Sequence, residues 1–126
     1  GQMNTNIIEF KDLIKRYESI TLEELTNPKL RLLGSRAIMN YLTGFGDYET
    51  CTLCVKAEEL SIEVYGNIFA TCNFCIWTTT DNFCYYGKNE QTYSAIWEAR
   101  NREKLFEAVK KRAEHMKKVL QEYKRM

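Results

Sequence analysis

The chain has 126 residues, of which 44% are hydrophobic and 28% are charged. This composition excludes wholesale disorder, because it can supply one hydrophobic core, and we expect a single domain over residues 1–126. No apolar run approaches the roughly 18 residues that a membrane helix needs, and the first residues lack a secretory pattern. We therefore expect a cytoplasmic, intracellular protein that does not bind membranes.

The net charge of +1 conceals a division of charge along the chain. Residues 100–126 contain ten Lys and Arg against four Asp and Glu, whereas residues 1–99 contain eight against thirteen. The two parts therefore carry net charges of +6 and −5. Such a division can mark a surface for an acidic partner, or the two parts can neutralise each other within one fold.

Residues 3–45 are predicted to form two or three helices. Apolar residues recur at helical spacing over residues 10–17, and Asn6 precedes them as a candidate helix cap. The Asn-Pro pair at positions 27–28 is typical of the start of a further helix. Gly44 follows the apolar stripe of that helix and predicts its end.

Residues 50–87 are predicted to form β-structure. Apolar and polar residues alternate over residues 60–64, which is the pattern of a half-buried strand. Gly66-Asn67 follows, with glycine at the first central position, as a type II′ hairpin turn requires. The pattern then predicts a return strand over residues 68–72 and a third strand over residues 83–86, after a turn at 81–82.

Residues 91–125 contain neither glycine nor proline, and they are predicted to form one long basic helix. Apolar residues recur in it at spacings of three and four, as in a heptad pattern. The unbroken helix would be about 50 Å long, whereas a domain of this size is about 35 Å across. We therefore expect the helix to protrude, to bend or to meet a partner.

The five cysteines supply the strongest chemical signal. Cys51 and Cys54 form one C-x-x-C pair, and Cys72 and Cys75 form a second pair after seventeen intervening residues. Four thiolates at such a spacing can close a tetrahedral shell around zinc. These residues resemble zinc-ribbon-type four-cysteine modules. The resemblance covers residues 51–75, and it implies a structural Zn²⁺ and a role in binding protein or nucleic acid, or in stapling the fold.

Other uses of the cysteines stay open. The same thiolates could hold an iron–sulfur cluster, one C-x-x-C pair could be a redox dithiol, or the thiols could be buried without a ligand. Cys84 fits no further C-x-x-C pair and is expected to be a small buried residue, although it could replace one ligand. His115 is the only histidine, and we expect it to be exposed on the C-terminal helix rather than a further ligand.

No catalytic pattern is visible in the sequence. No signature surrounds any serine or cysteine as a Ser-His-Asp or Cys-His arrangement requires, and no glycine-rich phosphate loop is present. Four cysteines would also close the zinc shell against a substrate. We therefore predict a protein that is not an enzyme and that has no small-molecule substrate.

The C-terminal helix carries a basic stripe that is a candidate partner surface. Its members are Lys104, Lys110, Lys111, Lys117, Lys118, Lys124 and Arg125. We expect an α+β fold with N-terminal helices, a central zinc-stapled antiparallel β-hairpin or meander, and a long C-terminal helix. The predicted function is a small regulatory or adaptor protein that docks onto another protein or onto a second copy of itself. The alternative is nucleic-acid binding by the basic helix and the aromatic residues of the zinc module.

Overall fold

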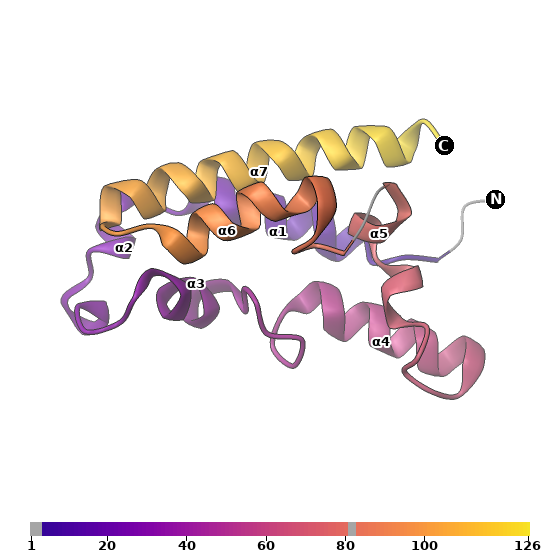
Figure 1. Cartoon of the computed structure of the whole chain (residues 1–126). Helices are drawn as coiled ribbons and strands as arrows, with labels where there is room; N and C mark the ends of the chain where they lie inside the picture. The colour runs from indigo at the N-terminus through magenta and orange to yellow at the C-terminus, as the bar shows by residue number, and fades with distance from the viewer. Residues whose placement is uncertain (1–3, 81–82) are drawn as a thin grey trace.

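A computed structural model describes residues 4–80 and 83–126, and these residues form helices and turns without a β-strand (Figure 1). The α-helices are α1 (Ile7–Ser19), α2 (Leu22–Leu25), α3 (Ser35–Thr43), α4 (Thr52–Tyr65), α5 (Ile76–Thr80), α6 (Glu90–Glu98) and α7 (Arg102–Lys124). Three short 3₁₀ helices connect them: η1 (Pro28–Leu30), η2 (Thr71–Phe74) and η3 (Gly87–Asn89).

The core forms where α1 packs along α7. The buried face of α1 carries Phe10, Leu13, Ile14 and Tyr17, which recur at helical spacing as the sequence predicts. Helices α5 and α6 also pack on α7, while α4 packs on α1 and on η2. In the view of Figure 1, α3 and α4 lie below this layer, so the segment with the C-x-x-C pairs covers one end of it.

The β-structure predicted over residues 50–87 is wrong. Leu53, Ala57 and Leu60 are buried at helical spacing on one face of α4, so residues 60–64 form a helix although apolar and polar side chains alternate there. Gly66 has φ +75°, and its N–H donates to the carbonyl of Ile62. Gly66 is therefore the residue in left-handed conformation that ends α4, and it is not part of a hairpin turn. The described fold is therefore all-α rather than α+β.

The other predicted strands are also helices or turns. Residues 68–72 run through the turn after α4 into η2, and residues 83–86 form a turn before η3. The turn predicted at positions 81–82 lies outside the described residues. The likeness to zinc ribbons therefore does not extend to the fold, because a ribbon needs the strands that this segment lacks.

The long C-terminal helix is divided into two. It breaks at residues 99–101, where the Asn101 side chain accepts a hydrogen bond from the backbone N–H of Lys104 (2.8 Å) and caps α7. Helix α6 folds back and packs against α7. The segment therefore fits within the domain, whereas one straight helix over the same residues would have been too long. Val109, Ala113 and Met116 of the heptad pattern are buried in the chain's own core, so this seam is not free for a partner.

Candidate metal centre

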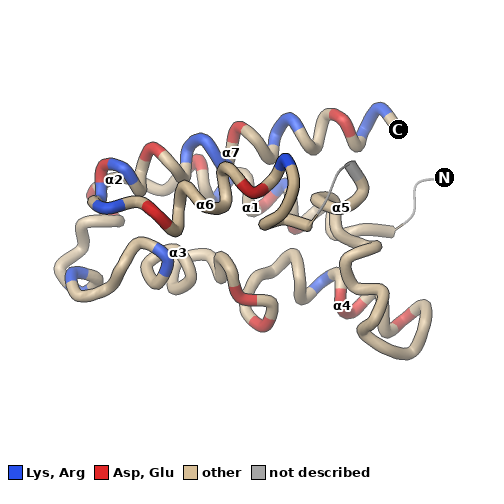
Figure 2. Tube along the Cα trace, in the orientation of Figure 1, with Lys and Arg blue, Asp and Glu red and all other residues tan. Residues whose placement is uncertain are grey.

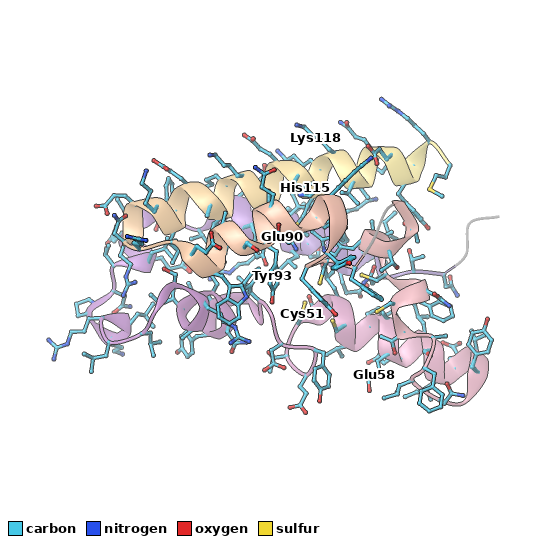
Figure 3. All side chains as sticks on the ribbon, viewed as in Figure 1. Cys51, Glu58, Glu90, Tyr93, His115 and Lys118 are labelled. Carbon is cyan, nitrogen blue, oxygen red and sulfur yellow. The ribbon has the colours of Figure 1, made fainter. Side chains whose placement is uncertain are left out.

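All five cysteines are free thiols, and they line one pocket of about 470 Å³ beside α4, η2 and the turn before η3. Figure 3 labels Cys51 at the start of α4 and Tyr93 of α6 above it, and both residues line this pocket. A smaller inner cavity of about 40 Å³ adjoins it and is lined by Cys51, Cys54, Cys75 and Cys84. Cys72 is exposed and lines the outer pocket.

The start of α4 positions the first C-x-x-C pair. Cys51 is the N-cap of α4, although its side chain makes no cap hydrogen bond. A thiol hydrogen bond from Cys54, together with the nearby backbone N–H groups of Leu53 and Cys54, lowers the pKa of Cys51 to about 6, although burial opposes this shift. The same thiol hydrogen bond, together with burial, raises the pKa of Cys54. The pair therefore carries its negative charge on Cys51.

The buried side chain of Asn6 joins the two cysteine segments. Its Nδ2 donates to the carbonyl of Leu53 (2.9 Å), between Cys51 and Cys54, and its Oδ1 accepts from the N–H of Ile76 (3.0 Å), next to Cys75. Burial raises the pKa of the Cys75 thiol to about 12, and a hydrogen bond with Asn6 opposes this shift. Asn6 thus connects the two C-x-x-C segments in a region where the predicted hairpin does not form.

Arg112 of α7 brings a buried positive charge to the same place. Arg112 is 3% exposed, and its guanidinium donates to the carbonyls of Cys84 (2.7 Å) and Asn89 (2.9 Å). Its central carbon lies 4.0 Å from the centroid of the Trp77 ring, which places the charge against an aromatic face. Burial raises the pKa of Cys84 to about 11, and the Arg112 charge opposes this rise. The cation therefore favours the thiolate form of Cys84.

The cysteines share a pocket, but they do not form a finished metal site. Within residues 4–80 and 83–126, no three His, Cys, Asp or Glu side chains converge closely enough to hold an ion. The prediction of a zinc ribbon is therefore wrong, since both its strands and its assembled thiolate shell are missing from this part of the chain. Cys84 also lines the pocket. In the sequence, only its position near the other four cysteines indicated that it could belong to the same site.

His115 is half-buried rather than exposed. Its Nδ1 lies 2.7 Å from the hydroxyl of Thr92, and its ring meets the edge of Trp77 with 5.2 Å between the centroids. The Thr92 hydroxyl also accepts a hydrogen bond from Arg112, so this one hydroxyl joins His115 to Arg112. This arrangement gives His115 a role in packing beside Arg112.

The predicted basic stripe is divided between structural and exposed residues. The ammonium group of Lys110 donates to the carbonyls of Tyr17 (3.2 Å) and Ile20 (2.7 Å), which lie at the C-terminal end of α1. Lys117 forms an ion pair with Glu18. The remaining predicted residues are exposed: Lys104, Lys111, Lys118, Lys124 and Arg125. Figure 2 shows that acidic residues alternate with them along α7.

Five exposed apolar side chains lie in the last turn of α4 and in the turn that follows it. We call these residues the α4 apolar surface: Ile62, Val64, Tyr65, Ile68 and Phe69. Phe69 is 92% exposed although it lies on an ordered turn. The buried hydroxyl of Ser61 donates to the carbonyl of Asn67 (2.7 Å) and accepts from the N–H of Ala70 (3.1 Å). The Asn67 side chain also accepts from the N–H of Phe69 (3.0 Å), so the turn holds this ring in solvent.

Comparison of the chain with protein-family models, with curated proteins and with solved structures finds no match. Among the described residues, no helix combines the length and the apolar character that are needed to cross a lipid bilayer.

Proposed function

We propose that the chain is a small non-catalytic adaptor or regulatory protein that docks onto a protein partner through the α4 apolar surface. The observation that carries this proposal is the exposure of Phe69 on a turn that is fixed by the buried Ser61. A chain that only needed to close its own core would gain free energy by burying this ring or replacing it with a polar side chain.

The energetics favour such a ring as an anchor. Burying a phenylalanine side chain contributes about 1.5–3 kcal/mol, and aromatic anchors in pockets dominate many protein interfaces. The hydrogen bonds of Ser61 and Asn67 already order the turn, so little conformational entropy is lost when a partner covers it. The centroid of the neighbouring Tyr65 ring lies 6.2 Å from that of Phe74, which is buried, so Tyr65 is supported from below by the chain's own core.

The charges around this surface define the chemistry of the partner. Residues 47–75 contain five Asp and Glu against one Lys, and Figure 2 shows acidic positions along α4. Figure 3 labels Glu58, which also lines the cysteine pocket. A partner that presents an apolar pocket with Lys or Arg at its rim would match both features. The same acidic charge disfavours a nucleic acid at this end of the molecule, since phosphates would be repelled.

Two substitutions test the proposal. Phe69→Glu places a charge at the most exposed residue of the α4 apolar surface. Leu32→Glu is the control, because it places the same charge at a similarly exposed apolar residue (89%) elsewhere, in the turn after η1. Tagged proteins are used to capture partners from native lysate, with and without nuclease. We expect the wild-type and Leu32→Glu proteins to capture the same protein and Phe69→Glu to lose it, whatever the nuclease treatment.

Three outcomes would overturn the proposal. Capture by Phe69→Glu that equals the wild type would exclude this surface. Capture that is lost with nuclease, and also lost in a Lys111→Glu, Lys118→Glu double variant, would favour nucleic acid bound to α7. A dimer in light scattering that dissociates with Phe69→Glu would identify the occupant as a second copy of the chain.

We further propose that the protein works inside the cell. Five free thiols in one segment persist in a reducing compartment, whereas an oxidising one would join them in disulfides.

A further inference from the structure

We infer that the cysteine pocket binds one zinc ion in its inner cavity through four of its five thiolates, and that Cys84 replaces the exposed Cys72 in the ligand set. The ligands are then Cys51, Cys54, Cys75 and Cys84. The inner cavity is lined by residues at the start of α4, although Ile68 of the α4 apolar surface lines the outer pocket. The inference does not depend on the proposed docking function.

The linings of the two cavities separate the four proposed ligands from the fifth cysteine. The same four cysteines line the outer pocket and the inner cavity of about 40 Å³, so their side chains form the boundary between the two spaces. Cys72 is exposed and belongs to the outer lining. A structural zinc ion takes four ligands, and a fifth thiolate is left over. The residue that is already turned to solvent is the one that the ion does not need.

The walls of the inner cavity suit a dry metal centre. Leu13, Phe45 and Trp77 are buried and line it, so they exclude water from one side. An assembly of four thiolates around zinc carries net negative charge, which a buried site must balance. Arg112 lines the same cavity and supplies a positive charge next to Cys84. The cavity thus contains soft ligands, an apolar wall and a counter-charge.

Three of the four ligands lie beside helices rather than within one. Cys51 precedes α4, Cys75 follows η2, and Cys84 lies in the turn before η3. The four thiols do not converge on one point in this part of the structure, so metal binding requires some of them to turn inward. A cysteine has a single side-chain torsion before its sulfur, and rotation about that one bond is all that such a movement needs. Asn6 meanwhile holds the first and second segments together through Leu53 and Ile76. The ion would join these two segments to the Cys84 turn, whose backbone carbonyl accepts a hydrogen bond from Arg112 of α7.

A binding measurement on the reduced protein tests the ligand set. We would titrate the wild type, Cys84→Ser and Cys72→Ser with Co²⁺ and follow the thiolate-to-cobalt charge-transfer absorbance, then displace the cobalt with Zn²⁺. Helical content from circular dichroism reports whether each variant is folded. We expect one equivalent of metal in the wild type and in Cys72→Ser, and an affinity lower by about tenfold or more in Cys84→Ser.

A second measurement needs no substitution, and it decides the question if Cys84→Ser does not fold. The wild type is alkylated with iodoacetamide, with and without Zn²⁺, and the modified cysteines are located by mass spectrometry. We expect Zn²⁺ to protect the four proposed ligands and to leave Cys72 reactive. No metal in the wild type, bound iron with sulfide, metal loss in a folded Cys72→Ser, or protection of Cys72 in place of Cys84 would each overturn the inference.

Discussion

The side chain of Asn6 and the carbonyl of Leu53 form a buried hydrogen bond of 2.9 Å between residues 47 positions apart in the chain. The same amide accepts a hydrogen bond from the N–H of Ile76. One side chain thus holds the two cysteine segments together at the start of α1, where it makes no side-chain cap hydrogen bond to that helix.

Removing this amide should destabilise the protein strongly. Asn6→Ala leaves the Leu53 carbonyl and the Ile76 N–H buried without these partners, and the expected loss is about 3 kcal/mol of unfolding free energy. Asn4→Ala is the matched control, because Asn4 is exposed and the change should stay within about 0.5 kcal/mol. Urea denaturation of both variants measures the difference. Equal midpoints would show that Asn6 does not connect the segments.

Two adjacent lysines should differ sharply in their contribution to stability. Lys110 donates to three carbonyls at the end of α1, including that of Glu18, whereas Lys111 is exposed. Lys110→Ala should lower the unfolding free energy by about 1–2 kcal/mol, because these carbonyls lose charged hydrogen bonds. Lys111→Ala should change it by less than about 0.5 kcal/mol. Thermal melts of the two variants that coincide would exclude the structural role of Lys110.

A comparison of Gly44 and Gly66 separates the cost of a steric clash from the cost of an unfavourable backbone conformation. Both have positive φ, but a Cβ at Gly44 would lie 2.5 Å from the carbonyl oxygen of Thr50, whereas a Cβ at Gly66 would meet no atom within 4 Å. Gly66→Ala should therefore cost about 1 kcal/mol from conformation alone. Gly44→Ala should cost about 3 kcal/mol or more and displace the backbone next to Cys51. Calorimetric melts of both variants measure these losses, and a cost for Gly66→Ala that equals the cost for Gly44→Ala would contradict the close contact.

The turn that contains Phe69 should be less stable when the Ser61 hydroxyl is removed. Ser61→Ala removes the acceptor for the N–H of Ala70 and the donor to the carbonyl of Asn67. The free energy of local opening of this turn should therefore fall by about 1–2 kcal/mol. Hydrogen exchange over residues 66–71, followed by mass spectrometry, reports this change. Ser19→Ala is the control, because Ser19 is exposed at the end of α1. Unchanged exchange in Ser61→Ala would mean that the turn is ordered by other contacts.

Local patterns predicted the helices near the ends of the chain but misidentified the centre. The apolar face of α1 depends on neighbours within about one turn, and so does the start of η1, where the Asn27 side chain accepts a hydrogen bond from the N–H of Lys29. The alternation over residues 60–64 fitted a strand, yet the burial of Leu53, Ala57 and Leu60 against other elements favours a helix. Gly66 was interpreted as a hairpin residue, although the same left-handed backbone also ends helices.

The site was predictable in its chemistry and not in its geometry. The two C-x-x-C pairs identified four of the five cysteines that line the pocket. The contributions of Cys84, Arg112 and Asn6 arise from contacts between distant segments, and no spacing along the chain encodes them. The break before α7 had a local signal, since Asn101 caps that helix. One continuous helix was nevertheless predicted, because residues 91–125 contain no glycine or proline.

A photo-crosslinking amino acid at position 69, compared with the same residue at position 32, tests the proposed docking most directly. Both positions are exposed and apolar, and they belong to different turns of the fold. We predict that illumination in native cells joins position 69, and not position 32, to one protein partner. Equal crosslinking at the two positions, or crosslinking of position 69 only to nucleic acid, would contradict the account.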